Sequence, residues 1–192
     1  RSGQHANHHH PLYFERQQSC SPAMSDVMDK TLVLTGAQIN QKIKRIAFEV
    51  FENNAKEKSL VMAGIDGQGH AFAKLLAKEV KAIAGVEVNV IKVSVDKLAS
   101  SQGEVEVDLA PSAFKKKVVI LVDDVLNSGR TLAYAMKPFL ETGVKKMEVA
   151  VLVNRSRTSF PIMPTYTGYE LATTLTDHVE VKLGKEAAVY LS

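Results

Sequence analysis

The sequence predicts an α/β fold in which helices flank a mainly parallel sheet. Apolar runs typical of buried strands alternate with stretches whose apolar residues recur every three or four positions, as they do in amphipathic helices. The connections between these stretches are short, and strand-helix-strand order places successive strands in parallel. The length of 192 residues suits one domain of this class.

The first half of the domain alternates helix and strand. A capping box precedes apolar residues at helical spacing, and two asparagines end that helix. A short apolar run then predicts a buried strand, a second amphipathic stretch predicts a helix, and a run after a glycine turn predicts another strand. In order, these elements are the helix between Thr35 and Asn53, the strand Ser59–Ile65, the helix His70–Ala84 and the strand Val86–Val95.

The second half begins with a polar stretch in which three apolar residues alternate as in a hairpin strand. The next apolar run is nearly all β-branched and predicts a strand covered on both faces. A helix ending before a glycine, a buried strand, a bend between two prolines and two short strands follow. In order, these segments are 105–109, Val118–Val122, Arg130–Glu141, Met147–Val153, Pro161–Pro164, Val179–Leu183 and Ala187–Leu191.

Composition excludes several other classes of protein. Lys and Arg total 24 against 21 Asp and Glu, so the formal net charge of +3 excludes a strongly basic nucleic-acid scaffold. No apolar run approaches the roughly 18 to 20 residues that span a bilayer. The single cysteine, Cys20, excludes an intrachain disulfide. Because nothing demands secretion, we expect a cytoplasmic protein without a membrane partner.

Residues 1–23 differ from the rest of the chain. They are rich in His, Gln, Ser and Pro and lack the apolar core of a signal peptide. Metal binding by the histidines stays open, but a disordered leader or tag-like segment is favoured. Met24 is a plausible natural start, which leaves 24–192 as the domain.

The strongest functional signal follows the most apolar strand. Two acids, Asp123 and Asp124, come directly after it, and a turn of Asn, Ser and Gly then leads into a helix. We expect both carboxylates to face solvent as hydrogen-bond acceptors. Such a turn gathers backbone N–H groups that bind phosphate, although the Walker A ending is absent. For an acidic pair taken alone, ordinary turn residues are the favoured interpretation, so the length of the whole string decides. The predicted phosphate cradle consists of Val125, Leu126, Asn127, Ser128, Gly129, Arg130 and Thr131.

The string from Val118 to Thr131 resembles the phosphoribosyl diphosphate (PRPP) binding motif of type I phosphoribosyltransferases. That motif has four apolar residues, two acids, a short apolar and small stretch, and then Gly-Arg/Lys-Thr. From about Thr31 to Leu191 the chain is also similar to the PyrR family, pyrimidine-operon attenuation regulators that are also uracil phosphoribosyltransferases. The similar segments are Ala37–Glu49, Met62–Gly69, Ala150–Arg155, Phe160–Ile162 and Tyr166–Gly168.

The resemblance implies transfer of a 5-phosphoribosyl group from PRPP to a nucleobase, uracil favoured, with release of diphosphate. Asp123 and Asp124 would bind the ribose hydroxyls, the loop ending at Thr131 would hold the 5-phosphate, and Mg²⁺ would bridge ribose and diphosphate with indirect help from the two acids. The type I fold, a small hood made by later segments, and a homodimer or larger homo-oligomer are implied as well. Positioning and electrostatics carry such a reaction, so no protein nucleophile is needed.

Two regions depart from the pattern of the family. The turn Asp66, Gly67, Gln68 and Gly69 would bind diphosphate, but it has an acid and no cation where the family usually has Arg or Lys. The mobile segment that begins at Val95 offers one cation near its start, Lys97, as a diphosphate ligand. These departures lead us to expect activity weaker than the family norm and leave open a nucleotide-binding sensor with little catalysis.

Later residues would complete the site. By the same resemblance, Arg155 lies near the base or the diphosphate, and Tyr166, Thr167 and Gly168 belong to the hood that reads the base edge through backbone groups. RNA regulation is the competing function, since phosphate backbones bind clustered cations. Solvated element ends explain the clusters better, so RNA is a partner that is not favoured. The clusters are Lys42, Lys44 and Arg45; Lys115–Lys117; and Lys145 with Lys146.

Overall fold

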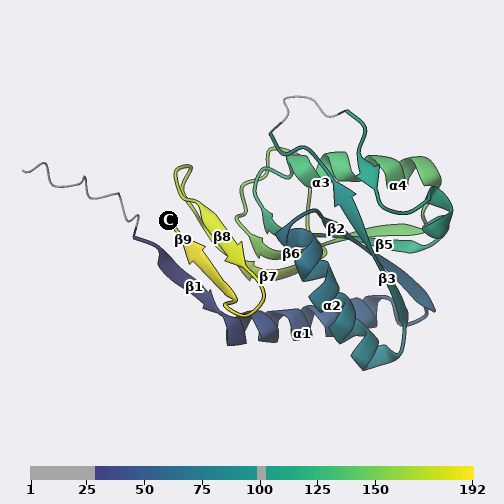
Figure 1. The fold of residues 1–192 in the computed structure, drawn as a ribbon, viewed down its shortest axis with the longest axis horizontal. Coiled ribbons are helices and arrows are strands. Elements are labelled where there is room, and N and C mark those ends of the chain that lie inside the picture. The colour runs from purple at the N-terminus through teal and green to yellow at the C-terminus, as the bar shows by residue number, and fades with distance from the viewer. Residues whose placement is uncertain (1–28, 99–102) are drawn as a thin grey trace, which may run out of the picture.

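A six-stranded sheet forms the centre of the molecule (Figure 1), seen in a computed structural model that describes residues 29–98 and 103–192. The predictions for the 1–23 leader and for the middle of the mobile segment lie outside these residues. The strand order is β4-β3-β2-β5-β6-β7, and all pairs are parallel except β3 with β4. The strands are β2 (Ser59–Ile65), β3 (Glu87–Ser94), β4 (Glu106–Val107), β5 (Val118–Leu126), β6 (Lys146–Asn154) and β7 (Tyr166–Glu170).

Helices cover both faces of this sheet, which confirms the predicted fold class. Alternate residues of a strand point to opposite faces. On β5, Ile120 and Val122 therefore pack with the two long helices, while Val119 and Leu121 pack with the short ones. The long helices are α1 (Gly36–Asn53) and α2 (Gln68–Ala84); the short ones are the 3₁₀ turn η1 (Pro111–Ala113), α3 (Arg130–Ala135) and α4 (Lys137–Thr142). No helix of the described residues is long and apolar enough to cross a membrane.

A second, antiparallel sheet in the order β1-β9-β8 lies beside the main sheet (Figure 1). It consists of β1 (Thr31–Thr35), β8 (Val179–Lys182) and β9 (Ala188–Leu191), and we call it the hood sheet. The two late strands were predicted, whereas β1 was not. Five residues of β1 carry one buried side chain, Leu34, so their periodicity gives little signal.

Two differences from the predicted elements bear on the site. The expected helix Arg130–Glu141 is broken at Met136 into α3 and α4, because Pro138 has no N–H to continue the helical hydrogen bonds. The central strand runs on to Leu126 instead of ending at Val122, so both acids lie within β5. The capping box at Thr35 and Gln38 and the bounds of β2 are confirmed.

Candidate active site

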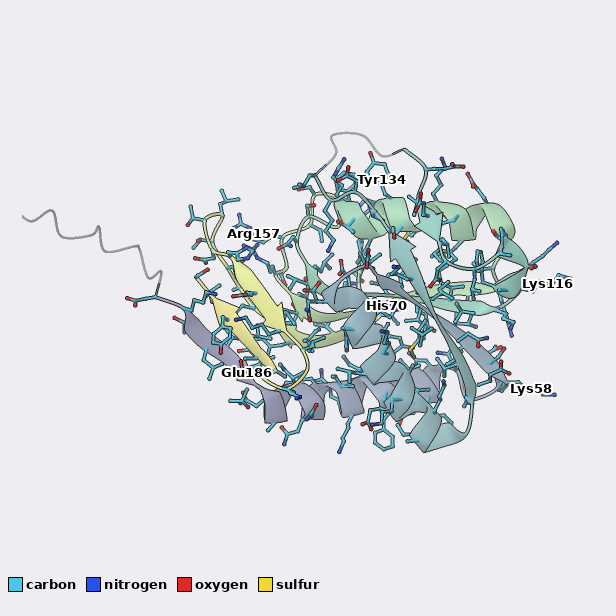
Figure 2. All side chains as sticks on the ribbon, viewed as in Figure 1. Lys58, His70, Lys116, Tyr134, Arg157 and Glu186 are labelled. Carbon is cyan, nitrogen blue, oxygen red and sulfur yellow. The ribbon has the colours of Figure 1, made fainter. Side chains whose placement is uncertain are left out.

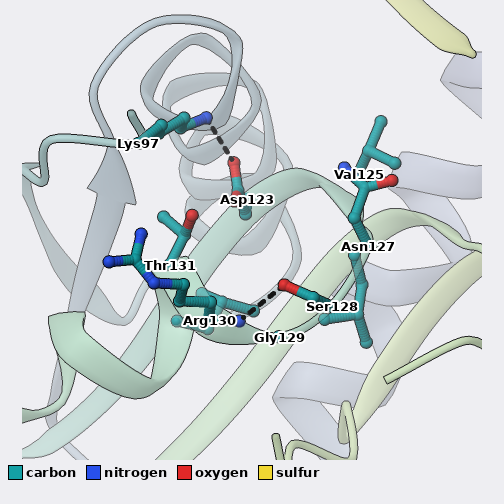
Figure 3. Close-up of a pocket in the computed structure, with 10 residues that line it drawn as sticks. Lys97, Asp123, Val125, Asn127, Ser128, Gly129, Arg130 and Thr131 are labelled. Atoms are coloured by element: carbon teal, nitrogen blue, oxygen red, sulfur yellow. Dashed lines mark hydrogen bonds and ion pairs between the residues drawn. The ribbon is translucent and has the colours of Figure 1, made fainter. Parts of the chain in front are cut away.

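The predicted phosphate loop lies at the carboxyl end of β5, between that strand and α3. Val125 and Leu126 still belong to β5 and pair with β6, so the loop itself begins at Asn127. The Ser128 hydroxyl accepts the Arg130 N–H at 3.3 Å, which holds the turn closed. Figure 3 shows Asp123 and the loop around one pocket, with Lys97 opposite the loop. Apart from Lys97 and Asp123, every residue that lines this pocket comes from the stretch Val125–Leu132.

A neighbouring segment clamps this loop from behind. The carbonyl of Ser128 accepts N–H groups of Ser159 and Phe160 at 2.8 and 3.0 Å. Gly129 has a φ of +83°, and a Cβ there would lie 3.1 Å from the Ile162 side chain. Glycine is therefore required both by the left-handed backbone and by the close packing. Segment 159–162 was not predicted as part of the site; its sequence signals were a proline bend and the resemblance of Phe160–Ile162 to the PyrR family.

Asp123 is buried at the floor of the pocket, with 3% of the residue exposed. Its Oδ1 accepts the Asp124 N–H at 3.0 Å and lies 3.9 Å from the Lys97 ammonium nitrogen. Burial, and then the charge of Asp124, raises the pKa of Asp123 well above its ordinary value, while Lys97 opposes the shift. A ligand hydroxyl or cation that contacts this carboxyl would therefore stabilise its charged form.

The expectation that both acids face solvent is wrong for Asp123. Consecutive residues of a strand point to opposite faces, so Asp124 turns away from the pocket that Asp123 lines. Asp124 is half-buried. The two carboxyls interact electrostatically, yet the pocket with the phosphate loop receives Asp123 alone of the pair.

The predicted diphosphate turn passes directly beside Asp123. A Cβ on Gly69 would lie 2.8 Å from the Asp123 Oδ1, so glycine permits this approach. The Asp66 carboxylate accepts the Gly67 N–H at 2.9 Å. Asp66, Gly67 and Gln68 are exposed, and α2 begins at Gln68 without a side-chain cap. The first N–H groups of α2 therefore remain available to an anion.

The expected hood residues Tyr166, Thr167 and Gly168 lie elsewhere. They form the start of β7, an edge strand of the main sheet, and not part of the hood sheet. The carbonyls of Thr167 and Gly168 accept hydrogen bonds from the Arg45 guanidinium at 2.6 and 2.9 Å. A Cβ on Gly168 would lie 2.5 Å from the Leu152 carbonyl oxygen, so this glycine serves strand packing.

Tyr166 belongs to a buried polar cluster rather than to a base-binding surface. Its hydroxyl donates to the Glu148 carboxylate, which also accepts the Asn54 side-chain amide and the Lys146 ammonium. Burial and the bond to Glu148 raise the pKa of the Tyr166 hydroxyl. The cluster ties the end of α1 to β6 and β7, which corrects the assignment of Tyr166 to the hood.

Arg155 lies at the expected edge, but its donors are engaged by protein groups. The guanidinium donates to the Asn127 Oδ1 at 2.8 Å, to the Thr173 hydroxyl at 2.9 Å, and to the carbonyls of Thr174 and Asp177. A second pocket lies here, next to the phosphate loop. Sequence reasoning missed the segment 171–178 that this arginine holds; its run of Thr and Asp residues is the signal of a hydrogen-bonded turn. The second pocket is lined by Asn127, Ser128, Arg155, Arg157, Ser159 and Leu175.

The residues present fit a magnesium ion that is carried mainly by a phosphorylated ligand. Mg²⁺ takes oxygen ligands, usually one or two carboxylates together with substrate phosphates and water. Asp123 can supply such a carboxylate beside the phosphate loop, while Asp124 turns away from this pocket and acts on it through its charge. Within 29–98 and 103–192, no three His, Cys, Asp or Glu residues come together as a metal site.

The comparison with known protein families decides the family. The model of the phosphoribosyl transferase domain matches residues 31–183, and that range contains both predicted binding loops. The chain belongs to the phosphoribosyltransferase family. Within the family it is PyrR-like. It is 32% identical over 166 residues to the bifunctional protein PyrR of Brevibacillus brevis, covering 83% of this chain and 93% of that protein.

Other comparisons agree at the level of family and fold. The bifunctional protein PyrR of Acetivibrio thermocellus is 30% identical over 164 residues, or 82% of this chain and 89% of that protein. A hypoxanthine-guanine phosphoribosyltransferase of Bacillus anthracis superposes with a TM-score of 0.62 at 19% identity, covering 74% of this chain and 84% of that one. The Trypanosoma cruzi hypoxanthine phosphoribosyltransferase gives 0.64 at 18%, with 75% and 79% covered. These structures show that the type I phosphoribosyltransferase fold is present.

Proposed function

We propose that this phosphoribosyltransferase moves the 5-phosphoribosyl group of PRPP to a nucleobase. The observation that carries the proposal is that Asp123 and the phosphate loop line one pocket with Lys97 opposite (Figure 3). In the reaction the bond between ribose C1 and diphosphate breaks, a nucleobase nitrogen bonds to C1 and loses its proton to water, and diphosphate leaves. Positive charge develops on the ribose as the bond breaks, so a fixed ribose and a stabilised leaving group lower the barrier.

Each part of the pocket has a role in this proposal. N–H groups and hydroxyls of the loop from Asn127 to Thr131 hold the 5-phosphate, with Val125 and Leu126 as the adjoining wall. Asp123 accepts a ribose hydroxyl, with Asp124 next to it. Lys97 and the free N–H groups at the start of α2 face the diphosphate. Magnesium would be held between Asp123 or Asp124 and ligand oxygens, where it would offset the charge of the leaving diphosphate.

Uracil is the acceptor that we favour, because the sequence similarity is to PyrR proteins. The solved proteins of similar fold are named as hypoxanthine or hypoxanthine-guanine phosphoribosyltransferases, so the test also includes purine bases. The second pocket, beside Asn127 and Leu175, is the proposed acceptor subsite. Incubation with PRPP and Mg²⁺ should release diphosphate in the presence of uracil. Diphosphate release with hypoxanthine or guanine but not with uracil would make a purine the acceptor. Diphosphate release without any base would contradict the proposed transfer reaction.

RNA regulation is the second candidate, and the contacts of the basic clusters weigh against it. Arg45 is bound to β7 carbonyls and to Glu49, Lys145 pairs with Glu57, and Lys146 pairs with Glu148. Cations engaged in this way contribute less to a phosphate backbone. Uridine-rich leader RNA should therefore bind weakly. Tight binding that falls steeply as salt rises would favour the regulator.

We further propose that the protein acts in the cytoplasm as a homodimer or larger homo-oligomer. Two large apolar side chains on different helices are strongly exposed, Phe48 on α1 and Leu140 on α4. Because single exposed apolar side chains are common on protein surfaces, the oligomer is proposed mainly from the resemblance to the PyrR family. Light scattering in solution should give a mass of at least two chains.

A further inference from the structure

The Arg155 side chain links Asn127, which lines both pockets, to the loop beside the second pocket. Arg155 follows β6, and its backbone N–H donates to the carbonyl of Leu126, the last residue of β5. Its guanidinium then reaches Asn127 on one side and three residues of the 171–178 loop on the other. This loop connects β7 to β8, and so links the main sheet to the hood sheet.

The middle of the 171–178 loop depends on arginine for its position. Its ends are fixed by backbone bonds, from Leu171 to the Asn154 carbonyl and between His178 and Ser192. Its middle accepts four hydrogen bonds from Arg155 and Arg157, and the Asp177 carboxylate accepts the Thr174 N–H within it. That last bond, aided by the two arginines, lowers the pKa of Asp177. Charge-assisted bonds of this kind are about twice as strong as neutral ones.

At Asn127 the arginine determines the orientation of a ligand-facing amide. A guanidinium has donors only, so its partner must be the Oδ1 of Asn127, and the Nδ2 donors must point away from Arg155. Asn127 lines both pockets. The orientation that satisfies Arg155 therefore leaves the amide N–H groups for an anion.

On the other side, Arg155 positions the apolar wall of the second pocket. Leu175 lies within the loop, is 86% exposed and lines that pocket with Arg155 and Arg157. Figure 2 shows Arg157 on the hood side of the molecule, and its guanidinium donates to the Thr173 carbonyl. Arg157 therefore holds the same loop, but no hydrogen bond joins it to Asn127.

We infer that Arg155 is a positioning residue that couples the phosphate loop to the acceptor subsite. The inference rests on the proposed function, since it takes the first pocket as the phosphate site. An anion on the Asn127 amide favours the orientation that Arg155 also favours, and the fixed guanidinium then orders the loop that carries Leu175. By linkage, a base in the second pocket strengthens phosphate binding by the same factor.

The variants are Arg155→Met and Arg157→Met, which remove the same charge from the second pocket. R155M removes the bond to Asn127 and three bonds to the 171–178 loop, whereas R157M removes one bond to that loop. Ribose 5-phosphate is the probe, and backbone hydrogen exchange of 171–178 is the readout. We expect ribose 5-phosphate to slow exchange in this segment in the wild type and in R157M, and not in R155M. Arg155→Lys keeps the charge without the planar fork and should also lose the effect, which keeps the test sharp if R155M folds poorly.

A second readout is the affinity for uracil and hypoxanthine with and without saturating ribose 5-phosphate. The wild type and R157M should show at least about a fivefold enhancement for the accepted base, and R155M and R155K close to none. Unchanged coupling in the Arg155 variants, or equal loss in R157M, overturns the inference alone. Failure of the wild type to bind ribose 5-phosphate overturns the proposed phosphate site as well, whereas coupled binding without transfer overturns only the enzymatic proposal.

Discussion

Asp123 is a residue at which ligand binding and stability oppose each other. Its carboxyl is buried beside a second acid, with one ammonium 3.9 Å away. We expect Asp123→Asn to raise the free energy of unfolding at pH 7 by about 1 kcal/mol, because the amide carries no charge into the interior. PRPP affinity should fall about 10- to 100-fold with the loss of a charged hydrogen bond. Chemical denaturation and calorimetric titration measure the two effects.

The difference in stability between D123N and the wild type should depend on pH, in a direction set by the raised pKa of Asp123. Because the pKa of Asp123 is raised on folding, the folded chain binds more protons than the unfolded chain between the ordinary and the raised values. The contribution of Asp123 to stability therefore falls as pH rises through this window and is largest below it. The advantage of D123N should vanish in acid. Asp124→Asn is the control, and an equal gain there would contradict the account.

Tyr166 allows a test of a structural role against a binding role. Removal of its hydroxyl by Tyr166→Phe leaves a buried carboxylate with one donor fewer. We expect the free energy of unfolding to fall by about 1 to 3 kcal/mol, while the affinity for nucleobase stays unchanged. Thermal denaturation and equilibrium binding provide the comparison. A stable variant that has lost base affinity would return Tyr166 to the acceptor subsite.

Gly129 in the phosphate loop is required for two reasons, its positive φ and its close packing against Ile162, and these can be tested separately. Gly129 and Gly143 both have positive φ, +83° and +76°, but a Cβ would meet Ile162 at the first and nothing within 4 Å at the second. Gly143→Ala should cost about 1 to 2 kcal/mol through backbone strain alone. Gly129→Ala should cost more and also weaken ribose 5-phosphate binding. If G129A and G143A lose the same stability and both still bind ribose 5-phosphate, the Ile162 side chain must move aside to accept the new methyl group.

The diphosphate turn is an element whose missing cation can be restored. Gln68 is exposed at the first position of α2, beside an exposed acid. Gln68→Arg should raise transferase activity about tenfold, which corresponds to roughly 1.4 kcal/mol in the barrier. It should tighten PRPP binding more than binding of a nucleoside monophosphate, which has no diphosphate. Equal changes for both ligands would show that this turn does not contact the leaving group.

At the scale of the whole molecule, metal and ligand should act together. Because Mg²⁺ in phosphate sites is held largely by substrate phosphates and water, we expect magnesium to bind together with PRPP. EDTA should therefore leave the melting temperature of the ligand-free protein unchanged and abolish its increase by PRPP. A chelator that lowers the melting temperature without ligand would point to a resident metal.

The sequence predicted the fold more fully than the site, for a physical reason. Buried parallel strands and amphipathic helices leave local patterns, which is why the bounds of β2 and the capping box at Thr35 agree with the structure. Strand β1 and the contacts of Arg155 depend on partners far along the chain, which local periodicity does not encode. The close approach of Gly69, in the first turn of α2, to the Asp123 carboxyl is likewise a contact between residues far apart in the chain.

The hood sheet also has a consequence for synthesis on the ribosome. Strand β1 is made first, yet its hydrogen-bonding partner is β9, with Thr31 opposite Leu191. Every strand of the main sheet, and with them Asp123 and the phosphate loop, is translated before that partner exists. A nascent chain can therefore assemble the main sheet with the proposed phosphate loop while β1 is still unpaired. The hood sheet, whose last strand is β9, is then the latest part of the described fold to form.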